Sequence, residues 1–206
     1  MTLKAVIFDF GDVLVRTADD SLRTAWERRL HLSPGQAEHI VFGGETEWAV
    51  QLGRVTDAQH WRWLQERLGL DDEALIRFRD DFFAGDRLDD DLMAYIARLR
   101  SRYHVGLLSN ATDIARRLLA DKYGIIRCFG SITISAEEGV MKPDPRIYRT
   151  ALARAGAEPA EALFVDDALR NIEGARALGM AALHYVDPLA ARRLLVALTG
   201  IEDGDA

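Results

Sequence analysis

Acidic side chains follow two apolar segments of the sequence. The run from Ala5 to Phe8 ends at Asp9, and a second run, from residue 162 to 165, ends at Asp166 and Asp167. A carboxylate held at the end of a buried strand can act as a nucleophile or as a metal ligand. The adjacent acids would repel Asp9 at close range, and a hard divalent cation such as Mg²⁺, which prefers oxygen ligands, would relieve that repulsion.

Two further motifs carry groups that can bind an anion. Ser109 and Asn110 follow the apolar run from residue 105 to 108. Their hydroxyl and amide, with the first N–H groups of a following helix, can hold an anion; a plain helix cap is the alternative. Lys142 precedes Pro143 and a predicted helix. Its charge could neutralise a phosphoryl oxygen and a nearby carboxylate, although a loop lysine on its own is usually only solvated.

The elements that must position these residues alternate along the chain. Apolar runs without a polar face predict strands buried on both sides, at residues 5–8, 105–108, 132–134, 162–165 and 181–186. Helical spacing of apolar residues lies between them, at residues 89–100, 112–122, 145–155 and 171–178, with a last helix from about residue 188. This order predicts an α/β fold with an open parallel sheet, and ligands bind such sheets beyond the carboxyl ends of the strands.

Residues 17–87 break the alternation. Helical patterns follow one another at residues 21–30, 34–42, 45–52, 57–68 and 73–83, and all four tryptophans of the chain lie among them. We therefore predict a helical cap domain, residues 17–87, inserted into a core domain made of residues 1–16 and 88–206.

The composition limits the partners. With 206 residues and a formal net charge of -7, the chain lacks the basic balance of a nucleic-acid or membrane-surface binder. A small phosphorylated substrate needs only local positive charge. The single cysteine, Cys128, cannot form an intrachain disulfide. No signal-peptide pattern and no apolar run near the ~18 residues of a membrane span is present, so a cytoplasmic location is the default expectation.

Taken in order, the four motifs resemble the haloacid dehalogenase superfamily of hydrolases. The resemblance runs from Ala5 to about Pro188. Within that superfamily the sequence is similar to bacterial phosphatases of the alpha-glucose-1-phosphatase type and to the N-terminal phosphatase domain of soluble epoxide hydrolases. The strings that carry this judgement are Leu-Ser-Asn at 108–110, Met-Lys-Pro at 141–143, Val-Asp-Asp at 165–167 and Asn-Ile-Glu-Gly-Ala at 171–175.

The resemblance implies a Rossmann-like core and a magnesium-dependent phosphatase. Asp9 would attack phosphorus and form an aspartyl-phosphate. Magnesium would be held by Asp9, Asp167 and the backbone carbonyl of Gly11. Asp166 would belong to the same metal site, as a ligand or as the group that orients the metal shell or Lys142. Lys142 would pair with Asp9 and with the phosphate. Positioning and charge neutralisation supply most of the catalysis of phosphoryl transfer.

The remaining motif residues are assigned to the substrate by the same resemblance. Ser109 and Asn110 would hydrogen-bond the phosphoryl group, and Asn171 would assist at the same site or support the loop of Lys142. The expected substrate is a small phosphorylated metabolite, of which a sugar phosphate is one example.

One position departs from the pattern of the superfamily. Most of its phosphatases carry a second Asp two residues after the nucleophile, as general acid and base, and here that residue is Gly11. Asp12 is offset by one residue, and neighbouring side chains of an extended strand end point to opposite sides. We therefore expect either an activated phosphate such as an anomeric one, or an acid supplied by the cap through Glu45 or Glu47.

Two other functions fit parts of the sequence. A 2-haloacid dehalogenase uses the same Asp nucleophile without metal and also lacks the second acid, which agrees with Gly11. Such enzymes usually carry non-acidic residues at the positions of Asp166 and Asp167, so the acid pair favours a metal-dependent phosphatase. A non-catalytic member that binds a ligand or partner through its cap is the third hypothesis.

Overall fold

Five parallel strands form the central sheet of the computed structural model, which describes residues 2–44 and 46–203. The strand order is β5-β4-β1-β6-β7, so the first strand lies in the middle between β4 and β6. This confirms the predicted α/β fold with an open parallel sheet. The strands are β1 (Ala5–Phe8), β4 (His104–Ser109), β5 (Ser131–Ile134), β6 (Ala162–Asp166) and β7 (Ala181–His184).

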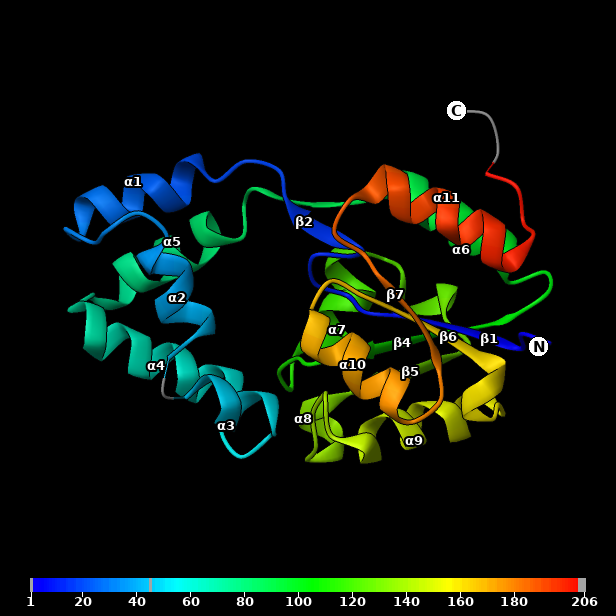
Figure 1. Ribbon diagram of the computed structural model, residues 1–206. Coiled ribbons are helices and arrows are strands. Elements are labelled where there is room, and N and C mark those ends of the chain that lie inside the picture. The colour runs from blue at the N-terminus through cyan, green and yellow to red at the C-terminus, as the bar shows by residue number, and fades with distance from the viewer. Residues whose placement is uncertain (1, 45, 204–206) are drawn as a thin grey trace.

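Helices cover both faces of this sheet (Figure 1). On β1, Val6 and Phe8 pack into the cluster that includes α6 (Asp90–Leu99) and α11 (Pro188–Thr199). Ala5 and Ile7 point the other way, into the cluster of α9 (Pro145–Ala155) and α10 (Leu169–Ala177). Because β1 is buried on both faces, it needs the wholly apolar sequence that it has.

The strand register brings the polar strand ends together. Phe8 pairs with Leu107 of β4 and with Val165 of β6. Asp9, one residue further along, donates its backbone N–H to the carbonyl of Val165 at 2.8 Å. Asp9 therefore lies level with Asp166 at the carboxyl edge of the sheet.

The insertion forms a helical lobe beside that edge (Figure 1). It has its own core, in which Trp26, Trp61, Phe78 and Phe82 are buried. Thr56 and Gln59 form a capping box that begins its longest helix. The helices are α1 (Ser21–Arg29), α2 (Gln36–Phe42), α3 (Glu47–Gln51), α4 (Asp57–Leu68) and α5 (Asp72–Phe82).

Two details differ from the sequence-based expectation. The predicted all-helical insertion is joined to the core by a short antiparallel pair, β2 (Val15–Thr17) and β3 (Asp86–Leu88), which crosses both predicted domain boundaries. Three-residue strands are too short to show a period in the sequence. The predicted helix 112–122 is divided into α7 (Ala115–Arg117) and a π-helical turn, η1 (Leu118–Lys122).

Short elements complete the described chain. None of the described helices has the length and apolar character needed to cross a membrane. The remaining elements are the 3₁₀ turns η2 (Ile126–Cys128) and η3 (Pro159–Glu161) and the one-turn helix α8 (Ser135–Glu138).

The two chain segments that link the lobes approach each other closely at Gly85. The N–H of Ala18 donates to the carbonyl of Gly85 at 2.9 Å, and a Cβ at position 85 would lie 1.7 Å from the carbonyl oxygen of Asp19. We predict that Gly85→Ala lowers the free energy of unfolding by about 1–3 kcal/mol, the cost of overpacking. Urea unfolding measures this. Gly11→Ala, where a Cβ meets no atom within 4 Å, is the control; equal losses in both variants would contradict the prediction.

Candidate active site

Three carboxylates meet at the carboxyl edge of the sheet. Oxygens of Asp9, Asp166 and Asp167 lie within 4.8 Å of one another. The first follows β1, the second ends β6, and the third begins the loop before α10. The strand register thus brings together the acids that are 157 and 158 residues apart in the chain.

The ammonium of Lys142 lies against two of these acids. Its side chain is fully buried, with Nζ 2.8 Å from Asp9 Oδ1 and 2.6 Å from Asp166 Oδ2. Nζ also donates to the carbonyl of Leu108 at 3.1 Å. An ammonium has three protons, so all of its donor capacity is used.

Asn110 holds the loop that carries Lys142. Its Nδ2 donates to the carbonyl of Lys142 at 3.0 Å, and its Oδ1 accepts from the N–H of Lys142 at 2.8 Å. Both polar ends of the Asn110 side chain are therefore bonded to the backbone of Lys142. The predicted contact of this amide with substrate stays a prediction.

Asp166 and Asn171 form a second supporting layer. Nδ2 of Asn171 lies 3.0 and 3.1 Å from the two Asp166 oxygens, and the N–H of Ala168 donates to Oδ1 at 2.8 Å. Asn171 is itself buried beneath Asp166. The structure thus places Asn171 where it orients the partner of Lys142, and its contact with substrate stays a prediction.

Close packing keeps this layer in place. A Cβ at Gly174 of α10 would lie 2.8 Å from the ring of Pro143 and 3.1 Å from the hydroxyl of Tyr148. That hydroxyl donates to the carbonyl of Asn171 at 2.8 Å. The Asn-Ile-Glu-Gly-Ala string therefore supplies one polar group and one close approach to the lysine loop.

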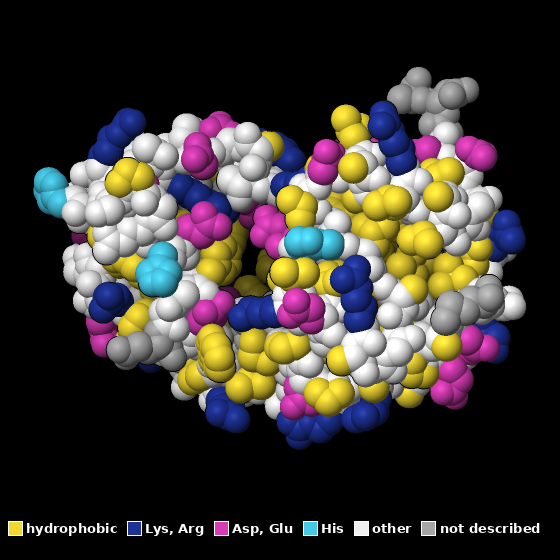
Figure 2. Space-filling view, viewed as in Figure 1, with side chains coloured by type: hydrophobic (Ala, Val, Ile, Leu, Met, Phe, Trp, Pro, Cys, Tyr) yellow, Lys and Arg dark blue, Asp and Glu magenta, His cyan; other side chains and the backbone are white. Residues whose placement is uncertain are grey.

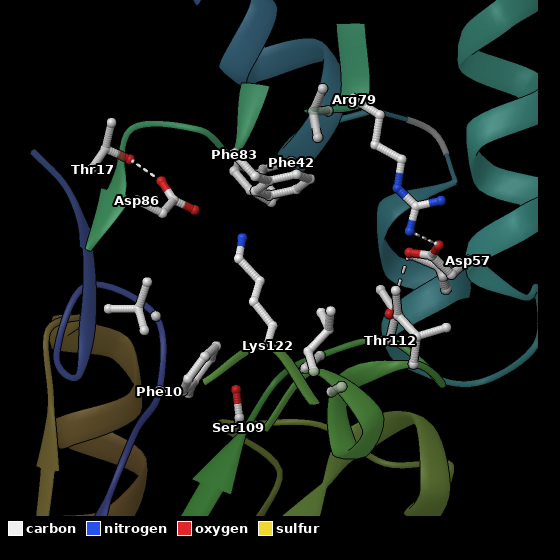
Figure 3. Close-up of a pocket in the computed structure, with 18 of the residues that line it drawn as sticks. Phe10, Thr17, Phe42, Asp57, Arg79, Phe83, Asp86, Ser109, Thr112 and Lys122 are labelled. Carbon is white, nitrogen blue, oxygen red and sulfur yellow. Dashed lines mark hydrogen bonds and ion pairs between the residues drawn. The ribbon is translucent and has the colours of Figure 1, made fainter. Parts of the chain in front are cut away.

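Ser109, Gly11 and Asp12 border an open cavity of about 990 Å³ between the two lobes. Ser109 is buried, and its hydroxyl points into the cavity beside Phe10 (Figure 3). Asp12 has a left-handed backbone, with φ 55°, so it leaves the extended path assumed from the sequence. Asp9 is not one of the residues that border the cavity, but it directly precedes Phe10 and Gly11, which do, and it keeps 8% of its surface exposed.

The charges of the cluster are not balanced within the protein. Burial raises the pKa of Asp9 to about 7, Lys142 opposes this rise and Asp166 adds to it. Burial also raises the pKa of Asp167, with added repulsion from Asp166 and Asp12. Burial alone would lower the pKa of Lys142, but Asp9 and Asp166 together raise it. Three carboxylates against one ammonium leave two negative charges for a divalent cation to neutralise.

The sequence did not reveal how the cap contacts this site. The N–H of Asp57, the first residue of α4, donates to the carboxylate of Asp113 in the core at 2.8 Å. Asp57 itself pairs with Arg79 of α5 at 3.0 Å and accepts from Thr112 at 3.4 Å. None of the residues in these contacts belongs to a sequence motif, so only the folded structure could identify them.

Of the two cap acids proposed from the sequence, one is placed by the structure. Glu47 of α3 is half-buried and borders the cavity. Glu45 lies outside the described residues.

Comparison with known proteins agrees with this architecture. The family described as haloacid dehalogenase-like hydrolase matches residues 3–179. The chain is 28% identical to a glyceraldehyde 3-phosphate phosphatase of Methanopyrus kandleri, over 86% of this chain and 82% of the relative. It is 26% identical to a sesquiterpene phosphatase of Aspergillus oryzae, over 97% and 98% of the two chains.

A solved structure resembles the fold. It is an enzyme from Bacteroides thetaiotaomicron of the same family, an Asp-to-Ala mutant in complex with magnesium and inorganic phosphate. The TM-score is 0.70 at 21% identity, covering 88% of this chain and 93% of that one. At this identity the likeness concerns the fold alone.

Removing the buried ammonium should unfold the core more readily. We predict that Lys142→Ala lowers the free energy of unfolding by about 3–5 kcal/mol, because Asp9 and Asp166 would lose their buried partner. Urea unfolding in EDTA measures the change. Lys122→Ala removes an exposed lysine that borders the same cavity and contacts the rings of Phe83 and Tyr123, and it should cost no more than about 1 kcal/mol. Identical midpoints for the two variants would refute the structural role of Lys142.

Proposed function

Because the chain belongs to the haloacid dehalogenase-like hydrolases, we propose that it is a magnesium-dependent phosphatase that hydrolyses a small phosphorylated metabolite through an aspartyl-phosphate. One observation carries the proposal. The carboxylate of Asp9 lies 2.8 Å from a buried ammonium and beside two further acids, and the residues that follow it, Phe10 and Gly11, border the cavity between the lobes. The phosphatases of Methanopyrus kandleri and Aspergillus oryzae, similar to this chain over most of its length, support the reaction class.

Asp9 is the nucleophile in this proposal. Its Oδ1 accepts from the N–H of Phe10 at 2.7 Å and lies next to Lys142, whereas no hydrogen bond to Oδ2 is found among residues 2–44 and 46–203. Oδ2 attacks phosphorus while the bond from phosphorus to the ester oxygen breaks. Water then attacks phosphorus in the aspartyl-phosphate, which releases phosphate and restores Asp9.

Lys142 and Ser109 stabilise the transferred group. The ammonium, held rigidly by Asp166 and Leu108, offsets the negative charge that builds up around Asp9. The Ser109 hydroxyl faces the cavity and donates to a phosphoryl oxygen. Because both groups are fixed before the substrate arrives, little reorganisation is needed during the reaction.

The acid cluster fits magnesium. Asp9, Asp167 and the backbone carbonyl of Gly11 would hold the ion, since Mg²⁺ favours oxygen ligands and the cluster has two excess negative charges. Asp166, also proposed as a ligand, already accepts from Lys142 and Asn171, so we assign it the orienting role. When bound, magnesium neutralises charge on the phosphoryl oxygens.

Glu47 supplies the proton that Gly11 cannot. It borders the cavity from α3, close enough to the core to interact with the charge of Arg170. Burial raises the pKa of Glu47, and Arg170 and the hydrogen bond from Gln51 oppose that rise. A carboxyl group that keeps its proton at higher pH is suited to protonate a leaving alcohol.

The central test is phosphate release with magnesium. We predict that the protein hydrolyses p-nitrophenyl phosphate, that EDTA stops the reaction and that added Mg²⁺ restores it. Asp9→Asn should reduce the rate to that of the buffer. Protein quenched in acid during turnover should gain the mass of one phosphoryl group, and the Asn variant should not.

A matched variant and two rival outcomes complete this test. Asp80→Asn alters an exposed carboxylate at the same cavity and should retain activity. Chloride release from 2-chloropropionate in EDTA would favour the dehalogenase hypothesis, which Gly11 supports. A folded protein that turns over no activated phosphate in the presence of magnesium would favour the non-catalytic one.

The role of Glu47 depends on the leaving group. We predict that Glu47→Gln slows hydrolysis of alkyl phosphates by about 10²–10⁴-fold, the range of general acid catalysis, and changes hydrolysis of p-nitrophenyl phosphate much less, because nitrophenolate leaves without a proton. The acid must be protonated, so the alkyl rate should fall as pH rises above the raised pKa of Glu47. That fall should be absent in the variant.

Two further variants separate this role from general damage. Glu38→Gln changes another glutamate at the cavity and should leave both rates unchanged. Gly11→Asp adds a carboxylate where a Cβ meets no atom within 4 Å, and in the Glu47→Gln background it should recover alkyl phosphate hydrolysis. Equal slowing of alkyl and nitrophenyl phosphates by Glu47→Gln would contradict the assignment.

A further inference from the structure

The cavity beside the proposed phosphate site has mainly apolar walls. Both lobes contribute to it, and Figure 2 shows a hollow between them with hydrophobic side chains in its wall. In Figure 3, Phe42 and Phe83 of the cap lie across the space from Phe10 of the core. The other large apolar residues that border it are Val15, Val41, Val50, Trp61, Ile76, Ile114, Leu118 and Tyr123.

Two of these side chains are left uncovered. Phe42 is 44% exposed and Ile76 is 62% exposed, although both border the cavity. Phe42 nevertheless joins the aromatic core of the cap, with its ring centroid 5.5 Å from that of Phe82. Apolar surface kept open to water beside a reactive site is available to an apolar ligand, which would gain free energy by covering it.

Several polar groups of the cavity are already paired. Asp57 accepts from Arg79 at 3.0 Å, and Arg23 donates to Asp86 at 3.0 Å (Figure 3 shows the first pair). Asp86 also accepts from the hydroxyl of Thr17 at 2.9 Å. These groups could bind the hydroxyls of a sugar only by giving up such bonds, and a buried polar group left unpaired is costly.

The charge of the cavity disfavours a second anionic group. The carboxylates that border the cavity outnumber its Lys and Arg side chains. The carboxylates that form no ion pair closer than 3.9 Å are Asp12, Glu38, Glu47 and Asp80. Lys122 is a cation there that forms no ion pair among residues 2–44 and 46–203. Its ammonium lies 5.7 Å from the ring centroid of Phe83 and 5.1 Å from that of Tyr123. An uncharged organic group therefore suits this space best.

From these observations we infer that the substrate is a phosphate monoester whose organic group is bulky, uncharged and apolar, bound between the Phe42–Phe83 wall and Phe10. The inference rests on the proposed function for its phosphate site. It replaces the sugar phosphate given as an example from the sequence with an ester of an aliphatic or aromatic alcohol.

The test measures binding without hydrolysis. Hexylphosphonate and methylphosphonate share the anionic head group and differ by five methylenes. In the presence of Mg²⁺, calorimetry should show that hexylphosphonate binds at least about tenfold more tightly, a modest part of what full burial of five methylenes would give. Ile76→Asn should reduce this ratio at least about threefold.

The control substitution is made on the same lobe. Leu22→Asn changes an exposed aliphatic residue of α1 that does not border the cavity, and it should leave the ratio unchanged. Equal affinity for the two phosphonates, or no binding of either, would overturn the inference. So would a higher kcat/KM for glucose 6-phosphate than for hexyl phosphate, whose leaving groups are both primary alcohols.

The result also separates the two proposals. Hydrolysis of p-nitrophenyl phosphate without any preference for hexylphosphonate would overturn the inference and leave the phosphatase proposal intact. Preferential binding of hexylphosphonate by a protein that hydrolyses no phosphate ester would reject the phosphatase and support the apolar ligand class.

Discussion

A single buried ammonium governs the architecture of the active site. Lys142 has no exposed surface and is in contact with Asp9 and Asp166. Taking such charges out of water costs several kcal/mol per ion unless every partner is in place, so the surrounding geometry has little freedom. Asn110 fixes the backbone of the lysine, and Asn171 fixes its second carboxylate. Asp9, the proposed nucleophile, is thus positioned by the same contacts that make burial of the lysine tolerable.

The proposed chemistry and the proposed contacts with the organic group of the substrate lie on different parts of the fold. The reactive groups lie on strand ends of the core, where the parallel register leaves them little room to move. The cap supplies about half of the apolar wall and is joined to the core by the β2–β3 pair and by the contact of Asp57 with Asp113. Apolar contacts are tolerant of sequence change, so a wall of this kind can vary while the strand ends stay the same.

Most of the fold could be predicted because burial leaves a pattern in the sequence. A strand covered on both faces must be apolar where it is covered, and this holds for all of β1 and for residues 162–165 of β6. The helices of the cap show the spacing of one buried face. The β2–β3 pair was missed because three residues are too few for a period, and residues 112–122 became a short helix with a π-helical turn through packing that local sequence does not encode.

By itself the sequence determined the order of the strands and helices and the identity of the polar residues at the strand ends, because those depend on local patterning. It indicated Asp9, Lys142 and Asp166 as one site only through their order along the chain. The tertiary structure decided that Asn110 and Asn171 support the lysine and its partner, and that Glu47 faces the cavity. Each of these contacts joins segments that are far apart in the chain. The distances between such segments are fixed only when the sheet register and the packing of the cap are complete.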